Sequence, residues 1–123
     1  MIIFHNTRCS KSRETLTILK ENNCDVEIRD YLNVPPSKKE IKEILAMLKV
    51  KPIDIVRKTE SLFLENYKDK KISDAKWIEI LSKHPILIER PIVIDGNKAV
   101  IGRPPKLVID FIKKKRVSKK LAE

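Results

Sequence analysis

The chain begins with MIIFHNTRCSKSRETLTILKE, residues 1–21, and this stretch decides how the fold starts. Residues 1–5 form a mainly apolar run that stops at turn-forming residues, which predicts a short buried strand. From residue 10 to about 21, apolar residues recur at spacings of three and four, which is typical of a helix that buries one face. Cys9 therefore stands in the loop between a strand and a helix, directly before the first helical turn.

A second strand and a block of helices follow. Residues 24–29 alternate between apolar and polar side chains, which predicts a strand that begins at Cys24. Several helices are then predicted between about 37 and 84. Ser37 and Glu40 form a capping box at the start of this block, and a second serine, at position 73, caps its last helix. No repeat or low-complexity linker separates the block, so we interpret it as an insertion packed on the same domain.

The last third of the chain predicts a hairpin and a final helix. Two β-rich runs, 91–94 and 98–101, are joined by Asp95-Gly96-Asn97, a common hairpin turn. Without the helical block, the order is β-α-β followed by β-β-α, the layout of a thioredoxin-like fold. We therefore predict an α/β protein with a mixed four-stranded sheet, whose first two strands pair in parallel and whose hairpin is antiparallel. The expected organisation is one domain over residues 1–123, with a helical insertion at about 37–84.

The composition is that of one folded domain. The chain has 123 residues, of which 41% are apolar and 36% charged. It contains no apolar run near the roughly 20 residues that a membrane helix needs, and no basic segment precedes its apolar start. We therefore expect a cytoplasmic protein without a membrane anchor. No stretch carries a surplus apolar face, so we expect a monomer.

The formal net charge of +10 favours anionic partners, which include nucleic acids, membrane surfaces and small oxyanions. Part of the excess lies near the C-terminus, at residues 113–116 and 119–120. Few aromatic residues accompany this charge and no nucleic-acid motif is visible. We interpret the basic cluster as a solvated helix end and argue against nucleic acid as a partner.

Cys9 has the surroundings of a reactive thiol. The start of a helix presents unpaired backbone N–H groups and partial positive charge, which stabilise a thiolate. Arg8, Lys11 and Arg13 add positive charge nearby, and His5 offers a proton relay or a further cation. The only other cysteine, at position 24, has no such cluster, and we expect a buried core thiol there. Two cysteines in this arrangement predict neither a disulfide framework nor a metal site.

The motif Cys9-Ser10-Lys11-Ser12 has serine where a CxxC motif has its second cysteine. A local disulfide therefore cannot close, and an oxidised adduct on Cys9 has to be resolved by an outside thiol or by Cys24 across the fold. Ser12 keeps a hydroxyl group near the sulfur, where it can help to hold the thiolate.

Residues 5–16 resemble the signature of the glutaredoxin-dependent arsenate reductases, which is Cys-x-x-Ser-Arg preceded by His-Asn. Further resemblance to this family, in the same order along the chain, comes from four segments: Tyr31-Leu32 with Pro35-Pro36, Arg57-Lys58, residues 84–93 (HPILIERPIV) and Gly102-Arg103-Pro104-Pro105. Thr7 and Ser10 depart from the pattern, because the family commonly has proline and glycine there.

The resemblance implies a function and a set of roles. Cys9 attacks the arsenic of arsenate, and three arginines, Arg57, Arg90 and Arg103, hold the oxyanion. Ser12 joins the arginines in binding substrate, while two residues support the site: His5 and Pro91, the latter with a cis peptide bond opposite the cysteine. The resemblance further implies glutathione as co-substrate, glutaredoxin as partner and no bound cofactor.

Two alternatives stay open at this point. One is an Spx-like transcription regulator, which shares the fold and binds RNA polymerase, although Ser12 argues against the CxxC switch that such regulators use. The other is a glutathione-linked thiol oxidoreductase that acts on a substrate other than arsenate.

Overall fold

A computed structural model describes the backbone of residues 1–122 and the side chains of residues 1–114. The basic side chains predicted at 115–116 and 119–120 therefore lie outside the described residues. The described chain forms two compact units, which we call the sheet unit and the helical unit. The sheet unit comprises residues 1–29 and the segment from Arg90 onward, and the helical unit comprises Asp30–Glu89.

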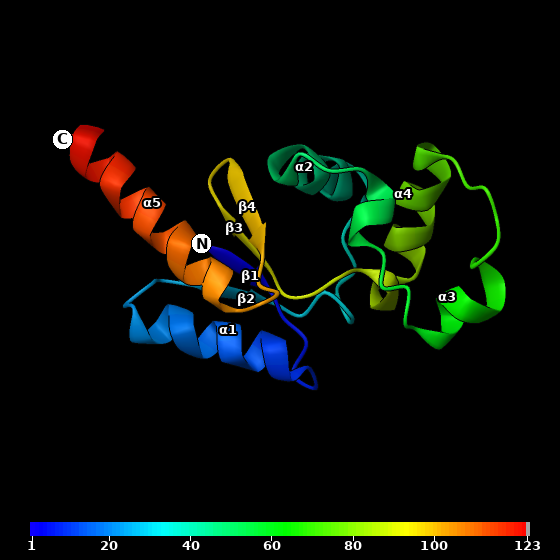
Figure 1. Ribbon diagram of the computed structural model, residues 1–123, viewed down its shortest axis with the longest axis horizontal. Helices are drawn as coiled ribbons and strands as arrows, with labels where there is room; N and C mark the ends of the chain where they lie inside the picture. Colours follow the sequence, from blue (N-terminus) through cyan, green and yellow to red (C-terminus); the bar gives the residue numbers. More distant parts are fainter. Residues whose placement is uncertain (123) are drawn as a thin grey trace. The chain divides into compact units, whose positions relative to one another are not determined.

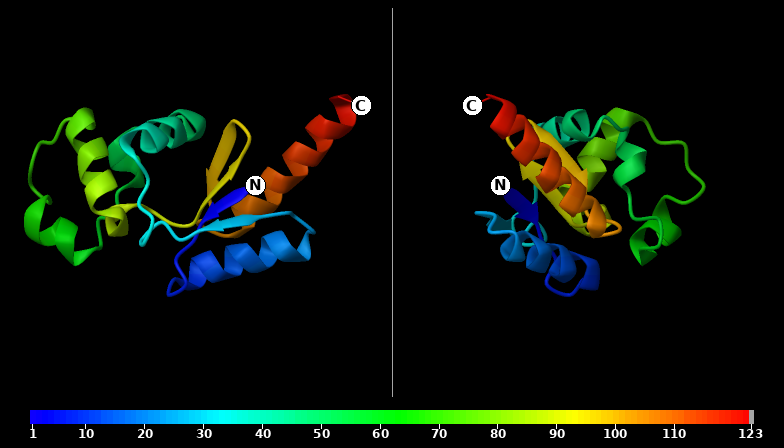
Figure 2. Two further views of the ribbon diagram at one scale, coloured as in Figure 1. Left: turned by 180° about the vertical axis from the view of Figure 1, so that it is seen from behind. Right: turned by 60° about the vertical axis from the view of Figure 1, so that its left-hand side comes forward.

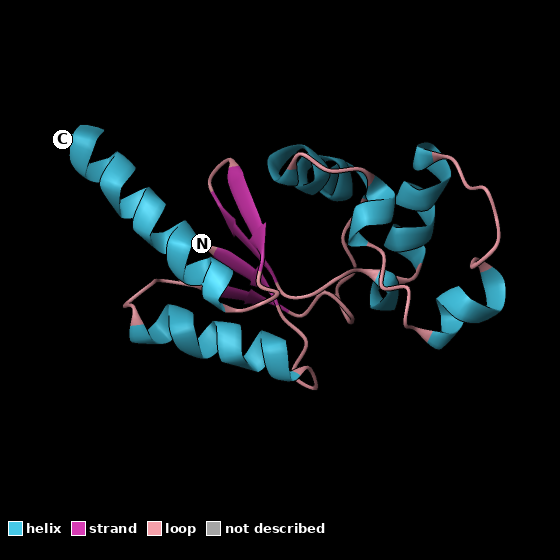
Figure 3. Cartoon of the chain, in the orientation of Figure 1, coloured by secondary structure: helices cyan, strands magenta, loops and turns pink. Residues whose placement is uncertain are grey.

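The sheet unit contains four strands and two helices (Figure 1, Figure 3). In chain order they are β1 (Ile2–Phe4), α1 (Ser10–Glu21), β2 (Glu27–Arg29), β3 (Ile92–Asp95), β4 (Lys98–Ile101) and α5 (Lys106–Ala122). The strand order in the sheet is β2-β1-β3-β4, with β1 and β2 parallel and the other two pairs antiparallel. Figure 2 shows β1 beside the β3–β4 hairpin from two further directions. The predicted α/β thioredoxin-like fold with a mixed four-stranded sheet is confirmed.

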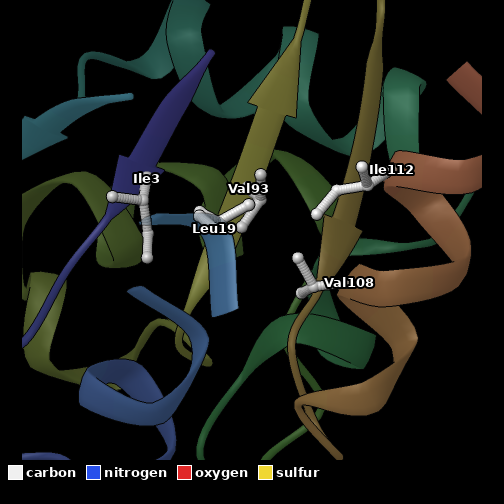
Figure 4. Packing of buried hydrophobic residues seen from close by; sticks show 5 residues of the cluster. All are labelled: Ile3, Leu19, Val93, Val108 and Ile112. Carbon is white, nitrogen blue, oxygen red and sulfur yellow. The ribbon is translucent and has the colours of Figure 1, made fainter. Parts of the chain in front are cut away.

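Helices α1 and α5 pack on one face of this sheet. Ile3 of β1 and Val93 of β3 are cross-strand partners, so their side chains point to the same face. Leu19 of α1 and two residues of α5, Val108 and Ile112, join them in one buried cluster (Figure 4). The apolar face that predicted α1 is thus the face that packs against the sheet. This packing holds the start of the helix, where Cys9 stands.

The second strand is shorter than predicted. It begins at Glu27 instead of Cys24, because the end of α1 uses the intervening backbone. Asn23 adopts a left-handed conformation with φ of 59°, and the Cys24 N–H donates to the carbonyl of Leu19 at 3.0 Å. Cys24 packs against the core cluster from this turn but is only partly buried, so the prediction of a buried core thiol was wrong.

The helical unit contains α2 (Lys38–Leu48), a short 3₁₀ turn (Pro52–Ile55), α3 (Ser61–Asn66), α4 (Asp74–Lys83) and a second 3₁₀ turn (Pro85–Leu87). The predicted capping box is present, because Ser37 Oγ accepts from the Glu40 N–H and the Glu40 carboxylate accepts from the Ser37 N–H, both at 3.1 Å. Ser73 caps α4 as predicted, accepting from the Lys76 N–H at 3.2 Å. The insertion proposed at about 37–84 falls inside this unit.

None of the helices described is both long and apolar enough to cross a membrane.

Candidate active site

Cys9 is the residue that precedes α1, and its backbone is extended, with φ of −95° and ψ of 119°. Its N–H donates to the carbonyl of Asn6 at 3.0 Å, which closes a tight turn after β1. Its own carbonyl accepts from the Arg13 N–H at 3.0 Å and so begins the helical hydrogen bonds of α1. The thiol is therefore held at the end of the helix where backbone N–H groups are unpaired.

A cluster of buried polar groups, with Asn6 at its centre, holds the loop between β1 and α1 in place. The Asn6 N–H donates to Ser12 Oγ at 3.0 Å, and its side-chain oxygen accepts from the Arg8 N–H at 2.9 Å. His5 Nδ1 lies 2.6 Å from the same serine hydroxyl. Asn6 is 6% exposed and Ser12 fully buried, so these bonds act away from water and define one conformation of the loop.

The Ser12 hydroxyl thus faces His5 and Asn6, while the backbone N–H of Ser12 is the group that bonds to the thiol of Cys9. Ser12 as a substrate-binding residue and His5 as a proton relay stay predictions. From the sequence, Asn6 stood out only as part of the His-Asn signature and had no predicted role, because that role rests on three backbone and side-chain bonds that only the folded loop creates.

The hairpin brings Arg90 and Arg103 together. Its register pairs Ile92 with Ile101, and the same register extended outward places Pro91 opposite Gly102 and Arg90 opposite Arg103. A ladder bond from the Gly102 N–H to the Pro91 carbonyl, at 2.9 Å, continues the pairing. Arg103 Nη1 then donates to the Arg90 carbonyl at 3.2 Å and to Cys9 Sγ at 3.9 Å. Two of the three predicted arginines are therefore neighbours at the thiol.

Several groups act on the protonation of Cys9. Partial burial raises the pKa of this thiol, but the other contributions outweigh it. The Ser12 N–H, a side-chain hydrogen bond from Arg90, the Lys11 N–H and the positive charge of Arg90 all lower the pKa, and the net result lies below the usual range of a cysteine. The contact from Arg103 is long, so we assign the main side-chain contribution to Arg90.

This environment predicts the pH dependence of alkylation. Because the pKa of Cys9 is lowered, the thiolate is already populated at a pH where an ordinary thiol is protonated. In a Cys24→Ser background, the rate of reaction with iodoacetamide should rise with pH and level off at a lower pH than that of a free cysteine, whose pKa is about 8.5. Alkylation quenched at timed intervals and followed by mass spectrometry measures this profile. A plateau reached only above that value contradicts the assignment.

Arg57 belongs to the helical unit. Its guanidinium forms ion pairs with Glu60 at 3.2 Å and with Glu89 at 3.1 Å, and its side chain is 17% exposed. The Arg57 N–H also donates to the Leu87 carbonyl at 2.7 Å. Neither carboxylate partner was singled out from the sequence: Glu60 lies three positions away and Glu89 lies 32 positions away along the chain. The role of Arg57 in oxyanion binding stays a prediction.

Pro91 has the predicted cis peptide bond to Arg90, and the Arg103–Pro104 bond is also cis. Gly102 is buried beside Pro91 and Thr15 of α1. The sequence did contain one indication of its importance: the chain has only two glycines, and the other is accounted for by the hairpin turn at Gly96.

Within the described residues, no group of three or more His, Cys, Asp or Glu side chains gathers as metal ligands would. The groups around Cys9 are instead cationic and N–H donors, which suit an oxyanion.

The chain is similar to known proteins over nearly its whole length. It matches the ArsC family over residues 4–111. It is 39% identical over 117 residues to an arsenate reductase of Haemophilus influenzae, which covers 91% of this chain and 98% of that protein. It is 40% identical over 112 residues to the uncharacterized protein YfgD of Escherichia coli K12, covering 89% and 94%. Among solved structures, an arsenate reductase from Vibrio cholerae has a TM-score of 0.83 and 38% identity, covering 89% of this chain and 94% of that one.

The matched family region includes Cys9, the hairpin and both arginines beside the thiol. The fold, the loop and the comparisons agree, and the chain belongs to the ArsC family.

Proposed function

We propose that this protein reduces arsenate to arsenite, with Cys9 as the nucleophile, glutathione as the reductant and glutaredoxin as the partner that restores the enzyme. The observation that supports it most is the thiol of Cys9 at the start of α1, with a lowered pKa and two guanidinium groups beside it. Relatives that align over nearly their full length carry the name arsenate reductase.

Electrostatics explain why the arginines are needed. A thiolate and an arsenate dianion carry the same sign of charge, so their approach is opposed unless cations offset it. Guanidinium groups present paired N–H donors that match the oxygens of a tetrahedral oxyanion, and they stay charged at all working pH values. Arg90 and Arg103 can supply this next to Cys9, and Arg57 is the proposed third contact.

The proposed chemistry proceeds in three steps. The Cys9 thiolate forms a bond to As(V) and displaces one oxygen, which leaves as water after protonation. The thiolate of glutathione then attacks Cys9 Sγ, and the electron pair of the S–As bond stays on arsenic, which becomes As(III) and leaves as arsenite. The two sulfurs are thereby oxidised to a mixed disulfide. A glutaredoxin thiol attacks the glutathione sulfur and releases the Cys9 thiolate.

An outside thiol is required because Cys24 is too far away. Cys9 precedes α1 and Cys24 follows it, so a helix of 12 residues, about 18 Å long, lies between the two cysteines. A disulfide needs Cα atoms within roughly 7 Å. Cys24 therefore cannot resolve an adduct on Cys9 while α1 is folded, and the reductant has to come from solution. The proposal places a monomeric enzyme in the cytoplasm, without a bound cofactor, since thiols supply both electrons.

The reductant decides between the proposal and its alternatives. Wild-type protein with arsenate and glutathione should produce arsenite in the presence of glutaredoxin, and little of it when thioredoxin and its reductase replace the glutathione system. Chromatographic separation of arsenite from arsenate measures the product. Equal turnover with thioredoxin contradicts the proposed reductant. Absence of arsenite with every reductant contradicts arsenate as substrate and favours a different glutathione-linked reaction.

A further inference from the structure

The end of β4 lies unusually close to α1. A Cβ atom built on Gly102 would lie 2.7 Å from Thr15 Oγ1, 2.9 Å from Pro91 Cγ and 3.3 Å from Thr15 Cγ2. Gly102 is not in the left-handed region, so the backbone conformation does not require glycine here. Glycine is required because there is no room for a Cβ atom: any other residue would force Thr15, Pro91 or the backbone of residue 102 to move.

Thr15 contributes shape to this contact. The residue is fully buried in α1, and its hydroxyl makes no hydrogen bond within the part of the chain that the structure describes. Its two branch atoms are the neighbours that Gly102 meets. The packing of these atoms is therefore what Thr15 adds at this point.

Gly102 is connected to the thiol of Cys9 through its chain neighbour and one backbone hydrogen bond. Its N–H donates to the carbonyl of Pro91 at 2.9 Å, which holds the two ends of the hairpin in register. Arg103 is the next residue, and its Nη1 reaches both the Arg90 carbonyl and Cys9 Sγ. The contact to sulfur is long, at 3.9 Å, so Arg90 is the arginine that chiefly lowers the pKa of Cys9. A displacement of the backbone at Gly102 shifts Pro91 through the hydrogen bond between them, and with it the neighbouring Arg90, whose side chain donates to the thiol.

We propose that Gly102 is a positioning residue of the thiol site. Because Gly102 has no side chain, its backbone can pack directly against Thr15 and Pro91, and this packing positions both arginines next to Cys9. The inference rests on the proposed role of the Cys9 thiolate. It adds that the activation of the thiol depends on packing between α1 and the end of β4, and not only on the charged residues themselves.

The test measures the pKa of Cys9 from the pH profile of iodoacetamide alkylation, in a Cys24→Ser background and without arsenate. Gly102→Ala should raise this pKa, which moves the alkylation profile to higher pH and lowers the rate at neutral pH because less of the thiol is ionised. Adding Thr15→Ala removes both branch atoms and should restore part of the low pKa, because the contact to Pro91 Cγ at 2.9 Å remains. Adding Thr15→Val, which keeps the shape of threonine, should not restore it. Rescue by the smaller residue alone identifies packing as the cause.

Gly96→Ala is the matched control. Gly96 has φ of 61°, and a Cβ atom built on it would meet no other atom within 4 Å. Alanine there therefore strains the turn of the same hairpin without touching Thr15. It should lower the melting temperature but leave the pKa of Cys9 unchanged. Circular dichroism establishes that each variant is folded. If Gly102→Ala does not fold, Thr15→Ile enlarges the same contact from the α1 side and should raise the pKa.

The outcomes separate the two proposals. A folded Gly102→Ala protein with the wild-type pKa overturns the positioning role, as does rescue by Thr15→Val equal to that by Thr15→Ala. An ordinary cysteine pKa in the wild type overturns the activated thiolate and with it the proposed function. A low wild-type pKa without arsenite production leaves the positioning role standing and overturns only the substrate.

Discussion

Cys9→Ser is expected to abolish arsenite production, with a loss on the order of a thousandfold or more in kcat. A serine hydroxyl is protonated at neutral pH and forms no bond to sulfur, so neither the attack on arsenic nor the mixed disulfide with glutathione can occur. The N–H donors of Lys11 and Ser12 and the charge of Arg90 stabilise a thiolate in the wild type, and they cannot make a hydroxyl ionise at this pH. The measurement is arsenite formed per enzyme in the glutathione–glutaredoxin assay.

Cys24→Ser is the control for this experiment. Cys24 lies beyond the far end of α1 and is only partly buried, so its replacement should leave turnover near the wild-type value. Activity in Cys9→Ser above about a hundredth of the wild type would contradict Cys9 as the nucleophile. A large loss in Cys24→Ser would contradict an outside thiol as the only resolving group.

Arg90→Ala should have the second-largest effect, a loss of about a hundredfold or more in kcat/KM for arsenate. Two causes act together. The side-chain hydrogen bond and the charge of Arg90 both lower the pKa of Cys9, so their removal leaves less thiolate at neutral pH. The substitution also removes a paired donor from the place where the oxyanion has to approach the thiolate.

Arg90→Lys separates these two causes. Lysine keeps the charge but lacks the fork of donors, so the pKa of Cys9 should stay closer to the wild type while kcat/KM remains low. The control is Lys20→Ala, a change of an exposed cation in the last turn of α1, which should alter neither quantity. An Arg90→Ala protein with wild-type kcat/KM would remove Arg90 from the site, whatever happened to the pKa.

Much of this site was predictable because its parts are local. The start of α1 at Ser10 follows from apolar spacing, and a thiol in front of a helix meets backbone N–H groups wherever the helix packs. The convergence of Arg90 and Arg103 depends on the register of the hairpin. The sequence predicts a turn at residues 95–97, whereas Asp95 pairs with Lys98, so the turn is Gly96-Asn97 and its register places the two arginines opposite each other.

Other features could not be read in this way. The buried contact among Gly102, Thr15 and Pro91 joins three segments, and no local pattern reports how closely they approach. The hydroxyl of Ser12 was expected at the sulfur, but the buried ring of His5 and the backbone of Asn6 bind it instead. The ion pairs of Arg57 likewise depend on a chain reversal that brings Glu89 to it.

By itself the sequence determined the order of the elements, the strand directions and the placement of Cys9 before α1, because periodicity, capping and turn chemistry act over a few residues. Only the tertiary structure decided which groups touch the thiol. Contacts such as that from Arg103 to Cys9 join residues 94 positions apart, and a contact of this kind depends on how α1 packs against the hairpin. Local patterns specify where a helix or strand forms, whereas distances between elements are set by how their side chains fill the space between them.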